Sequence, residues 1–221
     1  MSLPSNRLSV NEVAVVTNVP PRAVNDIVDD AILPSRFVVR GPGRALRPRA
    51  CYLDAVYWDT SEQLTKPERL RIVRQLSEQF GQEPAASDMA TPRWRLPNLS
   101  SYVLHDGVLT IDLRSILRRV EKGGDRLDEA GEMVVVDPEV LGGIPVIRRT
   151  RIPVHDVAAS VREDIPVERI LRAYPVLTPR KIELAKLWSD AHPPTGKPRR
   201  VADDIPTAKL RSEVRVVRKA G

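Results

Sequence analysis

The sequence predicts a mostly α-helical protein with small β-hairpins, in which a winged helix-turn-helix unit precedes a C-terminal unit of strands and three helices. Two observations predict this class. Apolar residues recur with the period of a helix in several short segments, and capping residues or prolines flank those segments. Short β-branched runs next to glycine-containing turns lie between them, a pattern typical of hairpins.

Two short helices joined by a tight turn are predicted near the N-terminus. Ser9 and Glu12 have the spacing of a capping box, in which each side chain satisfies a backbone N–H at the start of a helix. Residues 17–19 form the predicted turn, and Pro20 and Pro21 begin the second helix, where proline is tolerated. Such a pair is a helix-turn-helix. The predicted buried residues are Val10, Val13 and Ala14 on the first helix and Val24, Ile27, Val28 and Ala31 on the second.

An arginine-rich hairpin, or wing, is predicted next, with strands at residues 37–39 and 46–52 around a turn at 41–43. The hairpin contains no acidic residue, so we expect phosphate contact or minor-groove insertion, with a merely solvated loop as the alternative. Cys51, in the second strand, is expected to be buried rather than nucleophilic. The predicted DNA-binding residues of this unit are Arg22 on the second helix and Arg36, Arg40, Arg44, Arg47 and Arg49 on the hairpin.

Composition and periodicity divide the chain into four predicted segments. The winged unit spans residues 1–81, and its last helix runs from 66 to 80 after a Thr65 cap. Residues 82–98 lack periodicity and are rich in Pro, Ala and Ser, which predicts a linker, although Trp94 is expected to pack against a neighbouring surface. A second unit spans 99–192, and residues 193–221 form a basic tail.

The second unit begins with a predicted hairpin, with strands at residues 101–104 and 108–111 on either side of His105-Asp106-Gly107. A helix starting at Asp112 is expected to end at Gly123-Gly124. Short strands are predicted at 133–136 and within 146–154, followed by three helices at 155–162, 166–174 and 179–191. Thr178 and Pro179 mark the start of the third of these helices as a cap and first-turn pair.

Residues 132–189 resemble an unknown-function domain that recurs in bacterial antitoxins. The resemblance rests on Asp137-Pro138-Glu139, on the run from Gly142 to Ile147, and on Thr150-Arg151-Ile152-Pro153-Val154. It implies a short strand followed by a homeodomain-like three-helix bundle, often dimeric, that binds DNA beside a toxin gene. If the third helix reads DNA, then Arg180, Lys181 and Lys186 lie on its outward side; an ordinary amphipathic helix with solvated cations is the alternative.

Residues 8–58 resemble, more faintly, the MerR-type winged helix-turn-helix. The sequence departs from a DNA-reading surface in one respect, because Asp26, Asp29 and Asp30 lie on the second helix and repel phosphate. If this unit contacts DNA, we expect the wing and Arg22 to contribute more than the body of that helix. Dimerisation is the alternative role.

Together the two units and the basic tail resemble the larger VapB-type antitoxins. That resemblance implies a homodimer that binds double-stranded operator DNA and neutralises a PIN-domain ribonuclease toxin encoded nearby. Guanidinium groups of the tail are expected to pair with the toxin's acidic pocket; a disordered solubilising tail is the alternative. A stand-alone helix-turn-helix transcription regulator without a toxin, and an adaptor that binds only proteins, also stay open. The predicted toxin-binding residues are Arg199, Arg200, Lys209, Arg211, Arg215 and Arg218.

Composition sets further expectations. The 221 residues carry a net charge of +6, which suits a phosphate-bearing or carboxylate-bearing partner, although solubility alone also explains it. One cysteine allows neither an internal disulfide nor a cysteine zinc site. Without a signal peptide or a long apolar run, the protein is expected to be cytoplasmic and not membrane-bound. His105, His155 and His192 share no helical face, so no metal, cofactor or enzymatic activity is expected.

Overall fold

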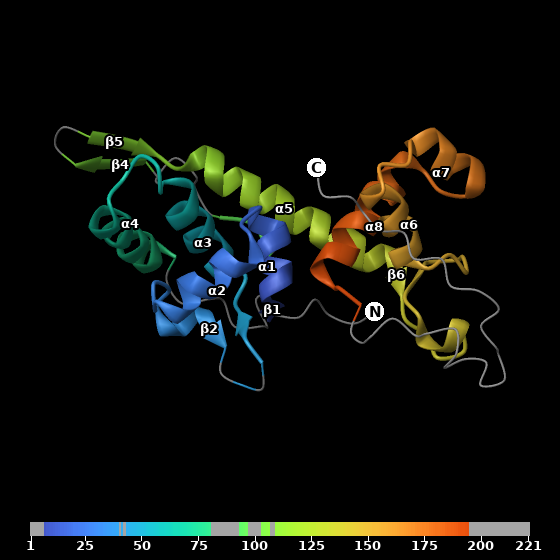
Figure 1. Cartoon of the computed structure of the whole chain (residues 1–221). Coiled ribbons are helices and arrows are strands. Elements are labelled where there is room, and N and C mark those ends of the chain that lie inside the picture. Colours follow the sequence, from blue (N-terminus) through green and yellow to red (C-terminus); the bar gives the residue numbers. More distant parts are fainter. Residues whose placement is uncertain are drawn as a thin grey trace, which may run out of the picture.

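The protein is mostly helical, with small antiparallel strand pairs, as the sequence predicts (Figure 1). The computed structural model describes residues 7–39, 41, 43–80, 93–96, 103–106 and 109–194. The long helix α5 (Arg114–Met133) runs from the N-terminal half of the molecule to the C-terminal half and packs against helices of both (Figure 1).

The N-terminal half is a winged helix-turn-helix. Its three strands are ordered β1-β3-β2, so the strand before the first helix pairs with the wing. Ser9 N donates to Glu12 Oε2 at 2.7 Å and Glu12 N donates to Ser9 Oγ at 3.2 Å, which confirms the capping box. Its elements are β1 (Leu8–Ser9), α1 (Val10–Thr17), α2 (Pro21–Asp29), η1 (Ser35–Phe37), β2 (Val38–Val39), β3 (Ala45–Leu46), α3 (Ala50–Asp59) and α4 (Lys66–Gln79).

The returning strand of the wing is shorter than predicted. It ends at Leu46, and Cys51 lies in α3 rather than in a strand. Pro48 has no N–H to continue a strand ladder, and the Ala50 N–H bonds to the Arg47 carbonyl, so the chain turns into a helix. Cys51 is nevertheless fully buried, and burial raises the pKa of its thiol well above the usual value.

The sequence predicts that this helix ends at Gly123-Gly124, but α5 continues to Met133. The two glycines permit close packing instead of ending the helix. A Cβ at position 123 would lie 2.2 Å from the carbonyl oxygen of Val16 in α1, and one at position 124 would lie 2.0 Å from Cδ2 of Trp94. Tertiary contact therefore outweighs the low helix propensity of glycine.

Residues 93–96 belong to the core, although they fall within the predicted linker. Trp94 is 1% exposed, and its indole Nε1 donates to Asp128 of α5 at 2.8 Å. The hydroxyl of Tyr52 in α3 donates to the Trp94 carbonyl at 2.8 Å, and Leu96 N donates to Glu121 of α5 at 2.9 Å. The packing expected for Trp94 is confirmed, and this segment joins α3 to α5.

The C-terminal half contains the three predicted helices. The hairpin pairs Asp106 with Leu109, so its first strand extends two residues beyond the prediction; residues 107 and 108 between the strands lie outside the described residues. Gly142 and Gly143 have φ values of 64° and 85°, a left-handed backbone conformation that favours glycine and turns the chain sharply between β6 and β7. The elements are β4 (Val103–Asp106), β5 (Leu109–Asp112), α5, β6 (Val134–Val135), η3 (Leu141–Gly143), β7 (Val146–Ile147), α6 (Val154–Arg162), α7 (Val167–Ala173) and α8 (Pro179–Ala191).

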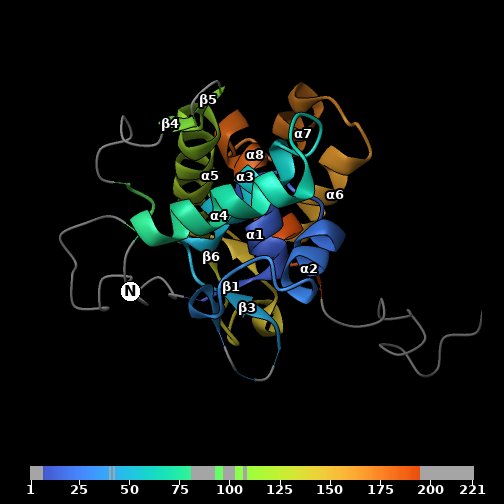
Figure 2. The same ribbon diagram turned by 90° about the vertical axis from the view of Figure 1, so that its left-hand side faces the viewer.

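One continuous hydrophobic core links the two predicted units. Helix α8 packs against α5 and α6 and also against α1 of the N-terminal half (Figure 2). Buried residues from both halves belong to one cluster. The N-terminal and C-terminal segments therefore share one core. The domain boundaries predicted at residues 81, 98 and 192 stay predictions.

Candidate nucleic-acid interface

The candidate interface is the exposed side of α2 together with the wing. Asn18, at the end of α1, has φ 61°, a left-handed conformation that turns the chain from α1 into α2. Ala23, Val24 and Ile27 anchor α2 in the core, which leaves Arg22 exposed on the opposite side. The helix-turn-helix thus has a solvent-accessible second helix, as a DNA-reading unit requires.

Cations from the wing and from α4 neutralise the acidic side of α2. Arg44 pairs with Asp29 at 2.7 Å and donates to Asn25 Oδ1 at 2.6 Å. Lys66, at the start of α4, pairs with Asp30 at 3.1 Å. The sequence shows acidic residues on α2 and an acid-free hairpin, but it does not show that the hairpin and α4 supply cations that pair with those acids. The hairpin contains no acidic residue of its own, but Asp29 of α2 pairs with its Arg44.

Other wing arginines contact neighbouring parts of the protein. Arg36 donates to the Ser77 carbonyl in α4, and its guanidinium lies 5.1 Å from the centre of the Phe37 ring. Arg49 is half-buried, 5.9 Å from the Phe80 ring, and Arg47 is also half-buried. Arg40 lies outside the described residues. Among the described residues, the predicted DNA-binding arginines of this unit that are exposed are therefore Arg22, Arg36 and Arg44, and Arg44 lies beside Asn25.

Two of the three predicted reading-face cations of α8 pair with acidic side chains of the protein. Seven residues of α8 are buried, because α5, α6 and α1 surround the helix. Arg180 forms ion pairs with Glu129 of α5 and with Glu183, and Lys186 pairs with Asp190 at 2.7 Å. The hydrogen bond from Arg180 holds the pKa of Glu129 below its usual value. Lys181 is half-buried, whereas the side chains of Arg180 and Lys186 are each 45% exposed, so the DNA-binding role of these three cations stays a prediction.

Lys186 faces the N-terminal half across a groove of about 440 Å³. One wall of the groove is the α1–α2 turn, including Asn18 and Val19, and the other is formed by α8 with Arg126 of α5. The Lys186 side chain is nevertheless 45% exposed, so its role in DNA binding stays a prediction.

His192 connects the C-terminal end of α8 to the first turn of α1. Its Nε2 lies 3.4 Å from Glu12 Oε1, and its ring stacks on Trp188 with 4.5 Å between centroids. Burial alone would lower the pKa of His192, but the Glu12 carboxylate outweighs burial and raises the pKa above its usual value. His155 is 2.9 Å from Ser189 Oγ, and burial with nearby Arg162 lowers its pKa. Both rings therefore have structural partners.

The part of the chain that the structure describes offers neither a metal site nor a membrane span. No group of three or more His, Cys, Asp or Glu side chains is placed to hold a metal ion. No helix there combines the length and the apolar character needed to cross a bilayer. The predicted toxin-binding residues, from Arg199 to Arg218, lie outside the described residues.

Comparison with known proteins identifies two similarities. Residues 134–187 match the family model described as "Protein of unknown function (DUF433)". Over 213 residues the chain is 39% identical to "Uncharacterized protein y4eO" of Sinorhizobium fredii (strain NBRC 101917 / NGR234), an alignment that covers 96% of this chain and 93% of the relative. The chain belongs to the same family as that protein. No solved structure matches the chain significantly.

The DUF433 match begins at β6 and ends within α8. It therefore includes the three-helix bundle but excludes α1 and α5, which cover α8 in this protein. Because the similarity to the Sinorhizobium protein extends over nearly the whole chain, the N-terminal winged unit is part of what the two proteins share.

Proposed function

We propose that this protein is a VapB-type antitoxin that binds operator DNA as a homodimer and neutralises a PIN-domain ribonuclease encoded nearby. The observation that carries the proposal is the combination, in one basic chain, of a winged helix-turn-helix with a DUF433 domain, a domain linked to toxin–antitoxin-like proteins. A winged helix-turn-helix suits duplex binding, and a net charge of +6 favours a polyanionic partner.

Within this proposal the N-terminal unit, rather than α8, contacts DNA. Arg22 and Arg44 are exposed on α2 and the wing, and Asn25 between them is of a residue type that pairs with adenine in the major groove. The ion pair with Asp29 also orients the Arg44 guanidinium. Phosphate can compete for Arg44 because both members of this pair are at least one-third exposed.

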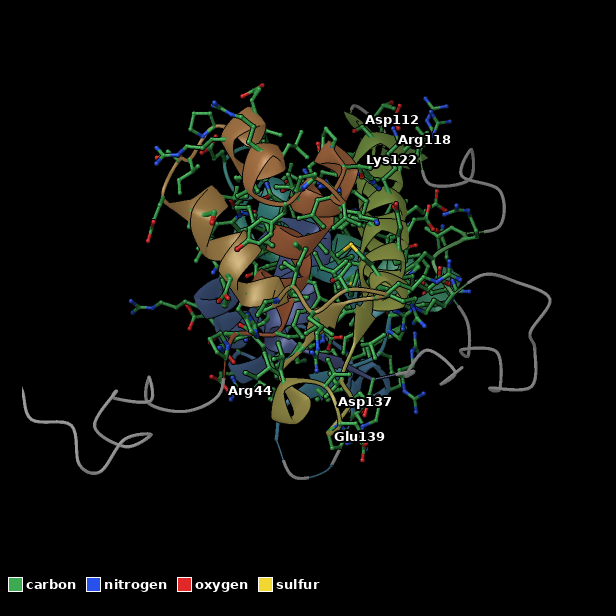
Figure 3. The ribbon with its side chains drawn as sticks, turned by 90° about the vertical axis from the view of Figure 1, so that its right-hand side faces the viewer. Arg44, Asp112, Arg118, Lys122, Asp137 and Glu139 are labelled. Carbon is green, nitrogen blue, oxygen red and sulfur yellow. The ribbon has the colours of Figure 1, made fainter. Side chains whose placement is uncertain are left out.

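The DNA-binding part of the proposal is tested with a duplex that carries the protein's own promoter. The double variant Arg22→Ala/Arg44→Ala should bind roughly tenfold or more weakly and show a smaller salt dependence, because up to two phosphate contacts are lost. Arg118→Ala/Lys122→Ala is the matched control. It removes the same charge from exposed positions on α5, at the opposite end of the molecule from Arg44 (Figure 3). Equal weakening by both variants would indicate nonspecific attraction.

The toxin-binding part is tested by co-purification with the product of the adjacent gene. The full chain should form a tight complex, and a chain that ends at residue 194 should not. A complex that forms equally well without residues 195–221 would refute the role of the tail. If no complex forms and promoter binding persists, the protein is a stand-alone regulator.

The charge of α2 favours a second candidate, an adaptor whose helix-turn-helix binds protein. Asp26, Asp29 and Asp30 are exposed on α2, which also presents Arg22 to solvent. Such a mixed surface suits a protein partner as well as it suits DNA. Affinity for duplex DNA that hardly changes between low and high salt would favour this candidate, since phosphate neutralisation makes affinity fall steeply with salt.

A further inference from the structure

Strand β6 has one paired edge and one open edge. The Arg148 N–H donates to the Met133 carbonyl at 2.7 Å, and Val135 pairs with Val146. Because hydrogen-bonded and non-hydrogen-bonded pairs alternate in an antiparallel ladder, the backbone groups of Val134 and Val136 point away from β7. The Val134 N–H bonds to the Gly131 carbonyl. Among the described residues, the Val136 N–H and carbonyl have no backbone partner.

The outer edge of β7, in contrast, is occupied. The Ile147 N–H donates to the Ile152 carbonyl and the Val154 N–H to the Pro145 carbonyl, both at 3.0 Å. The small sheet can therefore be extended only along β6. An uncovered strand edge is a template for pairing with another chain.

Three large apolar side chains are exposed beside this open edge. Val136 is 62% exposed, Leu141 is 42% exposed and Ile144 is 46% exposed. All three lie in the segment that connects β6 to β7, and the structure's other exposed large apolar residues lie on α3 and at the two ends of α7. Three of the exposed large apolar side chains therefore belong to one short segment, which makes this segment a candidate interaction surface.

Opposite charges lie at the two ends of this sheet. Asp137 and Glu139 follow β6 and project from the lower edge of the molecule (Figure 3), while Arg148, Arg149 and Arg151 follow β7. Because the two strands are antiparallel, the acidic and the basic segments lie at opposite ends of the sheet. Neither carboxylate forms an ion pair with another described residue.

We propose that β6 pairs antiparallel with β6 of a second copy of this chain. A two-fold axis near Val136 lets each Val136 N–H donate to the other Val136 carbonyl, which satisfies the backbone groups left open at that residue. Pro138 would lie opposite Val134 and has no N–H, so these two bonds are the backbone pairing of the contact. The same axis reverses the strand direction between copies, so the acidic end of one sheet meets the basic end of the other. Leu141 and Ile144 flank the paired strands and are covered on both copies.

Charge complementarity favours a second copy over an unrelated partner. A two-fold contact requires a surface that complements itself, and this sheet carries two acids at one end and three arginines at the other. An unrelated partner could bind either the acidic end or the basic end alone, whereas a second copy related by a two-fold axis uses both ends at once. The self-matching arrangement is therefore the specific feature that the proposed dimer explains.

The first experiment measures the mass of the full-length protein by sedimentation equilibrium without DNA. The wild type should be dimeric at concentrations on the order of 10–100 μM. Val136→Lys should be monomeric, because a lysine at a strand edge opposes pairing. Val176→Lys is the matched control, since Val176 is 55% exposed but follows α7, and it should stay dimeric. Unchanged far-UV circular dichroism verifies that both variants fold.

The second experiment exchanges charges across the proposed interface. Glu139→Arg and Arg151→Glu should each weaken the dimer by roughly 30-fold, because each variant places like charges together at two symmetric sites. An equimolar mixture of the two variants should associate again, because each chain then restores both ion pairs of the other. A structural defect in either variant could not be rescued in this way.

This proposal specifies the homodimer of the proposed antitoxin and so rests in part on that function. The two can fail separately, since association is measured without DNA or toxin. A monomeric wild type, or a dimer that Val136→Lys and the charge exchange leave unchanged, would overturn the interface. Operator binding by such a protein would leave the proposed function standing.

Discussion

Asp54 is a carboxyl group enclosed in the core of the N-terminal half, and its ionisation should govern much of the pH dependence of stability. Its side chain is 0% exposed, and neither of its oxygens accepts a hydrogen bond from a described residue. Burial raises the pKa of Asp54 from 3.8 to about 7, although nearby Thr17 offsets part of the effect. The Thr17 hydroxyl donates to the Val13 carbonyl at 2.8 Å.

The sign and size of the effect follow from this pKa. The folded state holds the Asp54 proton more tightly than the unfolded state, so the contribution of Asp54 to stability is greatest below pH 3.8 and is lost as the pH rises through about 7. A difference of roughly 3 pH units corresponds to about 4 kcal/mol. About 3 kcal/mol of this loss should occur between pH 4.5 and pH 8.

The variant Asp54→Asn removes the titration and keeps the shape of the side chain. Urea unfolding of both proteins at pH 4.5 and pH 8 gives the free energy of unfolding of each. The stability of Asp54→Asn relative to wild type should rise by about 3 kcal/mol between the two pH values. Asp26→Asn, at an exposed position on α2, is the matched control and should show no such rise. A constant difference between Asp54→Asn and wild type would refute the reasoning.

Two further predictions concern the contacts between the halves of the molecule. Gly124→Ala should lower the free energy of unfolding by about 1–3 kcal/mol, because its Cβ would overlap the Trp94 ring. Gly131→Ala in the same helix is the control. Its Cβ meets nothing within 4 Å, so it should raise the free energy of unfolding by about 0.5–1 kcal/mol. Equal effects in thermal unfolding would contradict the packing role. Because Glu12 raises the pKa of His192, their pair stabilises the fold below pH 6.5 and loses this effect as the pH rises through the raised value. Glu12→Gln should therefore cost up to about 1 kcal/mol at pH 6 and less at pH 8.5, and a loss independent of pH would exclude the ion pair.

The sequence by itself determined the elements whose signals are local. The Ser9–Glu12 box marks the start of α1. The Thr178–Pro179 pair marks the start of α8, which begins at the predicted residue, Pro179. These signals work because a cap satisfies backbone donors only three residues away, so the interaction needs no other part of the chain. Periodicity likewise identified the three C-terminal helices, since one buried face suffices to define each.

The tertiary structure alone decided which surfaces stay open. The local rule for Gly123-Gly124 predicts a helix end, but α1 and Trp94 approach so closely that only glycine fits, and α5 continues. Arg44 meets Asp29 across the wing, a contact between residues fifteen positions apart in the chain. Helix α8 packs its apolar side against α1 and α5, two helices that lie outside the DUF433 segment. Partners distant in sequence decide these outcomes, because burial and ion pairing depend on what lies across the interface and not on the pattern within one helix.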